Sequence, residues 1–175
     1  MRVTSLSLSH FRNYERALIE PDAGVTVFTG PNAQGKTNLL ESVYMLSTGR
    51  SFRTRFDKEL VGFGFSSAEI LADVISHERE QTINIALRPG TKKISVNGVK
   101  KTASELSETV NTVLFCPDDL NLIKEGAAVR RRLMDNAISQ IRPRYAGYLA
   151  EFNRLYEHKT RILKDWHEKP SLLET

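Results

Sequence analysis

The sequence reads Gly30-Pro31-Asn32-Ala33-Gln34-Gly35-Lys36-Thr37, which matches the phosphate-loop pattern G-x-x-x-x-G-K-[S/T]. Glycines let a backbone turn tightly and bring successive N–H groups toward one anion, and a following helix adds its unpaired N-terminal donors. In this pattern the lysine, here Lys36, reaches the β- and γ-phosphates, and the hydroxyl of Thr37 binds Mg²⁺. The loop therefore predicts a binding site for a nucleoside triphosphate.

The residues on either side predict the strand and the helix that such a loop needs. Residues 25–29 are mostly β-branched or aromatic and predict a short strand. Residues 36–48 predict a helix that ends at Gly49. Four apolar residues recur on one face of this helix, namely Leu39, Leu40, Val43 and Leu46.

Much of the remaining N-terminal sequence has the two-residue periodicity of β-strands. Strands are expected at 3–9, 68–75, 82–88, 92–96 and 113–116. The turn dipeptides Pro89-Gly90 and Asn97-Gly98 indicate that the middle strands form an antiparallel meander. Thr102 and Glu105 have the spacing of a capping box and predict the start of a short helix. We therefore expect an α/β fold with a mixed sheet that includes this meander.

The C-terminal part of the sequence is helical in pattern and basic. Helical periodicity begins after Gly126 and is divided at Pro143, because proline cannot donate an interior helical hydrogen bond. Residues 124–164 carry 10 basic and 4 acidic side chains, whereas residues 1–123 carry 14 of each. We expect two domains, residues 1–122 and 123–175, and the excess of basic residues suggests a polyanionic partner.

Composition excludes several classes of protein. Hydrophobic residues make up 40% and charged residues 26% of the chain, which is typical of a globular protein and not of a disordered one. A single cysteine, Cys116, rules out an intrachain disulfide and fits a reducing compartment. No window approaches the ~18 apolar residues of a membrane helix. We expect a cytoplasmic protein that does not bind membranes.

Five segments resemble, in order, segments of the RecF family of bacterial recombination mediators. They are His10–Tyr14, Phe28–Glu41, Gly49–Arg53, Phe115–Leu120 and Arg130–Asp135. The resemblance implies the N-terminal lobe of an ABC/SMC-type ATPase head, followed by the start of a helical lever-arm domain. It also implies a site for ATP and Mg²⁺. The residues carried over to that site are Gly30, Pro31, Asn32, Ala33, Gln34, Gly35, Lys36, Thr37, Asn38, Arg12 and Asn13, with Thr37 on the metal.

The resemblance further implies partners and a biological role. RecF-like proteins form ATP-dependent homodimers and bind DNA at gaps and single-strand/double-strand junctions. With RecR and RecO they promote loading of RecA during repair, replication restart and the SOS response. The candidate DNA contacts are Arg50, Arg53, Arg55, Arg130 and Arg131. Three consecutive arginines cannot all face one ligand, so we expect one of residues 130–132 to pair internally, for instance Arg131 with Asp135 at i+4.

The sequence also departs from the family pattern. The family's signature segment and Walker B pair have no counterpart in residues 1–175, so the resemblance implies the N-terminal portion of a longer protein. That longer protein is expected to be a weak DNA-dependent ATPase, and this chain alone is expected not to hydrolyse ATP. Asp118 or Asp119 is the candidate acidic ligand for Mg²⁺. Ala33 replaces a usual loop glycine, which is compatible with the loop if its φ is negative.

Two alternatives remain open from the residues alone. One is the head of an SMC-like chromosome-organising ATPase, against which the short heptad pattern broken at Pro143 argues. The other is a small P-loop nucleotide kinase with Asp118 on Mg²⁺, against which the antiparallel meander argues.

Overall fold

The computed structural model describes residues 1–76, 78–116 and 126–165. The chain divides into two compact units, Met1–Leu120 and Asn121–Thr175. The domain boundary expected at residues 122 and 123 lies outside the described residues, as do Asp118 and Asp119.

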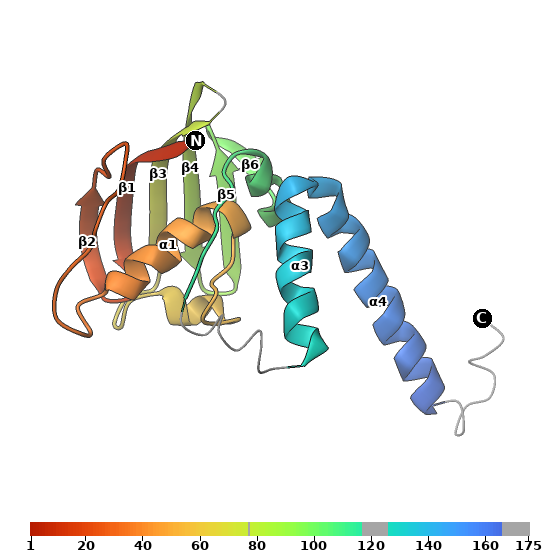
Figure 1. Cartoon of the computed structure of the whole chain (residues 1–175). Helices are drawn as coiled ribbons and strands as arrows, with labels where there is room; N and C mark the ends of the chain where they lie inside the picture. Colours follow the sequence, from red (N-terminus) through yellow and green to blue (C-terminus); the bar gives the residue numbers. More distant parts are fainter. Residues whose placement is uncertain (77, 117–125, 166–175) are drawn as a thin grey trace. The chain divides into compact units, whose positions relative to one another are not determined.

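A six-stranded sheet forms the first unit, with the strands in the spatial order β2-β1-β3-β4-β5-β6 (Figure 1). The strands are β1 Arg2–Phe11, β2 Tyr14–Ile19, β3 Ala68–Ser76, β4 Arg79–Arg88, β5 Thr91–Val96 and β6 Val99–Lys101. The predicted meander is confirmed, because β3, β4 and β5 pair antiparallel in sequence order. Asn97 and Gly98 both have positive φ, 51° and 78°, as a two-residue hairpin turn between β5 and β6 requires.

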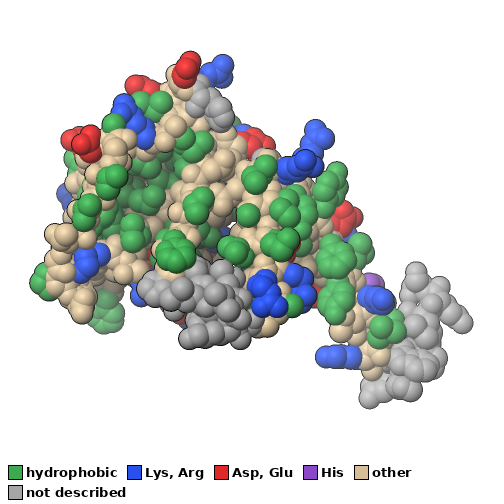
Figure 2. Space-filling view, viewed as in Figure 1, with side chains coloured by type: hydrophobic (Ala, Val, Ile, Leu, Met, Phe, Trp, Pro, Cys, Tyr) green, Lys and Arg blue, Asp and Glu red, His purple; other side chains and the backbone are tan. Residues whose placement is uncertain are grey.

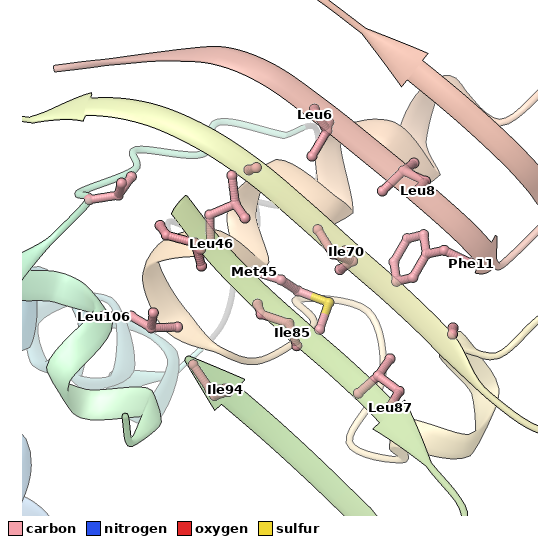
Figure 3. Close-up of a cluster of buried hydrophobic side chains, with 14 of the residues drawn as sticks. Leu6, Leu8, Phe11, Met45, Leu46, Ile70, Ile85, Leu87, Ile94 and Leu106 are labelled. Carbon is pink, nitrogen blue, oxygen red and sulfur yellow. The ribbon is translucent and has the colours of Figure 1, made fainter. Parts of the chain in front are cut away.

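One face of the sheet carries the hydrophobic core beneath helix α1, Lys36–Thr48, and the 3₁₀-helix η2, Ala103–Glu108. Side chains from β1, α1 and β3 to β5 point toward one another there (Figure 3). The labelled core residues are Leu6, Leu8, Phe11, Met45, Leu46, Ile70, Ile85, Leu87, Ile94 and Leu106. Helix α1 therefore lies fixed on the sheet, and its N-terminus holds the end of the phosphate loop.

Helix α1 has the predicted bounds but a rotated buried face. Gly49 ends the helix in the left-handed conformation, φ 61°, and its N–H donates to the Met45 carbonyl. Leu40, predicted on the apolar face, is 47% exposed, whereas Glu41 is fully buried. Glu41 is drawn inward because arginine side chains neutralise its carboxylate, as shown below.

Two predicted strands do not form. Residues 25–29 and 113–116 have no strand hydrogen bonding, and Val25 and Val113 are 88% and 99% exposed. A β-branched sequence forms a strand when a neighbouring strand pairs with it, and within the described residues none does so here. All pairs in the six-stranded sheet are antiparallel, so the mixed sheet expected from the sequence is not seen. The α/β fold class, helices packed on a sheet, is confirmed.

The second unit is a pair of helices, α3 Ala127–Ile141 and α4 Pro143–Asp165. The predicted division at Pro143 is confirmed, and α4 begins at that residue. The expected ion pair between Arg131 and Asp135 is not formed. The Tyr145 hydroxyl donates to Asp135 Oδ1 instead, at 2.7 Å.

Apolar side chains lie exposed along α3 and α4 beside basic ones (Figure 2). Residues Tyr148, Phe152, Leu155 and Tyr156 of α4 are each more than half exposed. A search of the described helices for a span that could cross the bilayer found none.

Candidate nucleotide-binding site

The backbone of residues 30–35 has the alternating conformation of an anion-binding loop. Gly30, Ala33 and Gly35 have φ values of 146°, 65° and 102°. Successive residues on opposite sides of φ = 0 direct neighbouring N–H groups toward one concave side. The condition under which Ala33 would replace glycine without cost, a negative φ, is not met, because this bend requires the left-handed region there. An L-alanine in that region costs roughly 1–2 kcal/mol, so the loop holds strain at this residue.

The first backbone N–H groups of α1 have no side-chain cap and face the concave side of the phosphate loop, where an anion would bind. The N-cap residue of α1 is Gly35, which makes no side-chain cap, and the first turn contains no acidic residue. The first N–H groups of a helix have no intrahelical partner, and together they are equivalent to roughly half a positive charge. A Cβ on Gly35 would lie 2.7 Å from Asn13 Oδ1 and 3.0 Å from the Tyr14 ring. Glycine is therefore required at position 35 by both φ and space. The bent loop and the uncapped helix N-terminus together fit a phosphate group.

Lys36 lies across its own loop. Its ammonium donates to the carbonyl oxygens of Gly30 and Pro31, both at 2.6 Å. A phosphate bound by the loop would compete for the same ammonium group. Thr37 is exposed in the first turn of α1, where its hydroxyl is accessible as one protein ligand for Mg²⁺.

Asn13 and Asn38 connect the loop to its surroundings. The Asn13 amide donates to the Gln34 carbonyl at 3.3 Å and accepts from Asn38 Nδ2 at 2.7 Å. Arg53 Nη1 in turn donates to Asn38 Oδ1 at 2.6 Å. Of the two asparagines proposed from the resemblance, Asn13 therefore contacts the phosphate loop directly, and Asn38 follows the loop by one residue and contacts Asn13.

Arg12, on the same turn as Asn13, pairs with a carboxylate that sequence reasoning missed. Its Nε and Nη2 donate to the two oxygens of Glu41 at 2.8 and 2.7 Å, and its Nη1 donates to the Glu59 carbonyl at 2.8 Å. Ser51 Oγ also donates to Glu41, at 2.5 Å, and Arg53 Nη1 lies 3.6 Å from the same carboxylate. The signal for Glu41 in the sequence is its place one turn before Met45, on the face that α1 buries.

The predicted DNA contacts are distributed over both units. Arg50 and Arg55 are exposed on the segment that follows α1, whereas Arg53 is held by Asn38 and Glu41. Arg130 and Arg131 are exposed on α3 of the second unit.

Comparison with known proteins identifies the family. The sequence profile described as "AAA domain" matches residues 5–166. The chain belongs to this AAA domain family. Within it, "DNA replication and repair protein RecF" of Clostridioides difficile (strain 630) is 39% identical over 175 residues. That alignment covers 99% of this chain and 47% of the relative, so the chain spans about half the length of the curated relative.

Solved structures agree with the sequence comparison. "Structure of the recombination mediator protein RecF-ATPrS in RecFOR pathway" matches with a TM-score of 0.91 at 34% identity, over 96% of this chain and 46% of that one. "Structure of the recombination mediator protein RecF-ATP in RecFOR pathway" matches with a TM-score of 0.85 at 36% identity, over 93% and 44%. The predicted resemblance to the N-terminal portion of RecF is confirmed.

A more distant structure shares the fold. It is described as "Structural biochemistry of ATP-driven dimerization and DNA stimulated activation of SMC ATPases". It matches with a TM-score of 0.64 at 21% identity, over 77% of this chain and 98% of that one. The predicted ABC/SMC-type ATPase head, as its N-terminal lobe, is confirmed as the fold.

Proposed function

We propose that the first unit binds ATP with Mg²⁺ at residues 30–37. The observation that carries the proposal is the uncapped N-terminus of α1, preceded by a left-handed Gly35 and followed by Lys36 and Thr37. The negative phosphates of a bound nucleotide would lie against the partial positive charge at the N-terminus of the helix. Lys36 would supply a cation, and Thr37 a ligand for the metal. Asn13 donates to the Gln34 carbonyl of the loop and accepts from Asn38, and Arg12, on the same turn as Asn13, pairs with Glu41 of α1.

Calorimetric titration with Mg²⁺-ATP tests this site in the full chain. We expect Lys36→Ala to weaken binding about 10- to 150-fold, because a charge-assisted hydrogen bond contributes roughly 1.5–3 kcal/mol. Lys100→Ala, at an exposed residue of β6, is the matched control and keeps the affinity of the unchanged protein. Equal affinity of the Lys36→Ala and Lys100→Ala variants would remove the proposal.

At the level of the cell, we propose a role in DNA repair and recombination of the RecF type, in the cytoplasm. The 39% identity to a protein named RecF and the match to RecF structures support it. The proposed partners are DNA at gaps or single-strand/double-strand junctions, RecR and RecO, and indirectly RecA in replication restart and the SOS response. The alternatives of an SMC head and a nucleotide kinase have weaker support, since the SMC match is 21% identical and carries fold alone.

For DNA binding, we propose contacts from Arg50, Arg53 and Arg55 and from Arg130 and Arg131. These side chains would contact phosphates, so the affinity should fall as the salt concentration rises. On duplex DNA, a plot of log affinity against log salt concentration should have a slope of about −0.9 for each phosphate neutralised. A fluorescence anisotropy titration at several salt concentrations measures this slope. An affinity that does not change with salt would contradict the proposal.

ATP is also proposed to drive homodimer formation of the longer protein, which would hydrolyse it weakly in the presence of DNA. For this chain we propose nucleotide binding without turnover. A phosphate-release assay with DNA checks the proposal, and turnover that disappears in Lys36→Ala would refute it.

A further inference from the structure

Three exposed aromatic rings lie in one short segment, residues 55–65, which follows Arg50 and Arg53 and precedes β3. Phe56, Phe63 and Phe65 are 61%, 103% and 42% exposed, although large apolar rings are usually buried. The segment is tied to the β1–β2 turn, because the Arg12 N–H donates to the Leu60 carbonyl at 2.8 Å. In Figure 1 it lies at the end of the sheet's strands where α1 begins, and the phosphate loop leads into α1 at that same end.

The turn that carries Phe63 has a defined backbone. The Phe65 N–H donates to the Gly62 carbonyl at 3.1 Å and closes a four-residue turn. Gly64, at the third position, has φ 84°, the value that favours glycine in a type II turn. The Gly62 N–H donates to the His10 carbonyl at 2.7 Å, which anchors the turn to β1. Phe63 is thus held at the tip of an anchored turn, with its ring in solvent.

The second ring of the turn is stacked on a strand residue. The rings of Phe65 and His10 are 3.9 Å apart between centroids and 10° from parallel. This stack fixes the orientation of Phe65 while 42% of the residue remains exposed. Rings that are already ordered lose little conformational freedom when a flat ligand stacks on them.

Cationic side chains are interleaved with these rings. The Lys58 ammonium lies 5.9 Å from the centre of the Phe56 ring, and Arg55 is exposed beside it in the sequence. The carboxylate of Asp57 is neutralised by Lys92 at 3.0 Å. Glu59, the other acid of the segment, accepts from the Thr54 hydroxyl at 2.6 Å. With Asp57 paired to Lys92, the segment combines flat apolar faces with two exposed cations, Arg55 and Lys58, which suit the phosphates of a polyanion that also has exposed aromatic faces.

We propose that the aromatic turn, residues 55–65, stacks unpaired bases of single-stranded DNA while Arg55 and Lys58 contact the flanking phosphates. This inference rests on the DNA binding proposed above and adds which form of DNA the segment recognises. Unpaired bases present free faces to aromatic side chains, whereas the bases of a duplex are already stacked on one another. A protein partner would not require the interleaved positive charge.

The test compares two DNA probes on the full chain in the presence of Mg²⁺-ATP. One is a fluorescent oligothymidine, and the other is a hairpin duplex with the same number of phosphates. Phe63→Leu keeps an apolar side chain but removes the aromatic face. We expect it to weaken binding of the oligothymidine about 5- to 150-fold, the loss of one stacked base, and to leave duplex binding unchanged. Phe152→Leu, at an exposed residue of α4, is the matched control and changes neither affinity.

Two further measurements, of 2-aminopurine fluorescence and of self-association, distinguish the possible failures. An oligonucleotide with 2-aminopurine should lose fluorescence on binding, and lose less with Phe63→Leu, if a base stacks on the ring. Unchanged oligothymidine affinity in Phe63→Leu, or an equal loss for both probes, overturns the proposal. If the chain self-associates, and Phe63→Leu abolishes this self-association but leaves the oligothymidine affinity unchanged, the ring contacts protein and the proposal is overturned. If the unchanged chain binds neither probe, the proposed DNA binding fails, and this inference fails with it.

Discussion

Arg12 in the β1–β2 turn and Glu41 in α1 form a two-point ion pair, with Nε and Nη2 donating to the two carboxylate oxygens at 2.8 and 2.7 Å. Glu41 is fully buried, so its charge depends on these donors and on Ser51. The pair ties the turn that carries Asn13 to the helix that carries Lys36, and Asn13 contacts the loop between them. The register of the loop against α1 is therefore set partly by this ion pair.

Removing one partner of the pair should be costly. Arg12→Ala leaves a buried carboxylate with Arg53 at 3.6 Å, and we expect the free energy of unfolding to fall by about 3 kcal/mol or more. Arg16→Ala, at an exposed residue of β2, is the control and should change it by less than about 0.5 kcal/mol. Urea denaturation measures both variants. Similar stabilities for the two would show that Glu41 is neutralised in another way.

Ala33 offers a test of strain in the phosphate loop. Its φ of 65° is easily adopted by glycine, so Ala33→Gly relieves roughly 1–2 kcal/mol of strain but adds about 0.4–1 kcal/mol of unfolded-state entropy. We expect a net gain of up to about 1.6 kcal/mol in the free energy of unfolding. Ala23→Gly, at an exposed residue without positive φ, carries the entropic cost alone and should destabilise the chain. A loss of stability in Ala33→Gly as large as in Ala23→Gly would contradict the strained conformation.

The capping box at the start of η2 predicts a pH dependence of stability. The side-chain hydroxyl and then the backbone N–H of Thr102, followed by Lys101, lower the pKa of Glu105 from 4.5 to about 2. Because the folded pKa is depressed, the stabilisation is complete above pH 4.5 and is lost as pH falls toward 2. Glu105→Gln should therefore flatten the pH dependence of unfolding in this range, measured by circular dichroism. Glu108→Gln is the control, and an equal change in both variants would argue against the box.

Tyr145 and Asp135 predict a titration difference in the helical unit. The hydrogen bond to Asp135 raises the pKa of Tyr145, because the carboxylate stabilises the neutral phenol. Asp135→Asn should lower that pKa toward the usual value of about 10, followed by NMR of the tyrosine ring. The contribution of the bond to stability is present below pH 10 and is lost as pH rises through the raised pKa. An unchanged titration in Asp135→Asn would mean that the bond is not formed in solution.

The elements predicted well are those whose pattern is decided locally. Helix α1 has the predicted bounds because Gly49 supplies the left-handed end that its last turn needs. The hairpin at Asn97-Gly98 forms because these two residues accept positive φ at low cost.

The elements predicted badly depend on partners distant in the sequence. Strand β2 was missed, since Tyr14–Ile19 lacks strict alternation and exists as a strand because β1 pairs with it. In the site, the glycines and Lys36 could be read from their spacing. For Glu41 the spacing indicates only the helix face it shares with Met45, and the burial of its carboxylate depends on Arg12 from another element. Ala33 adopts positive φ for the same reason, since the conformation of the whole loop overrides the preference of one residue.

The unpaired valines at 25 and 27, with Val113 and Phe115, have consequences for handling the protein. These side chains are 73% to 99% exposed on backbone that makes no strand pairs among the described residues. Short β-branched stretches with free backbone groups adhere to identical stretches on other molecules. Solutions of this chain should thus become turbid as protein concentration rises, and a charged substitution at Val25 or Val113 should keep them clear.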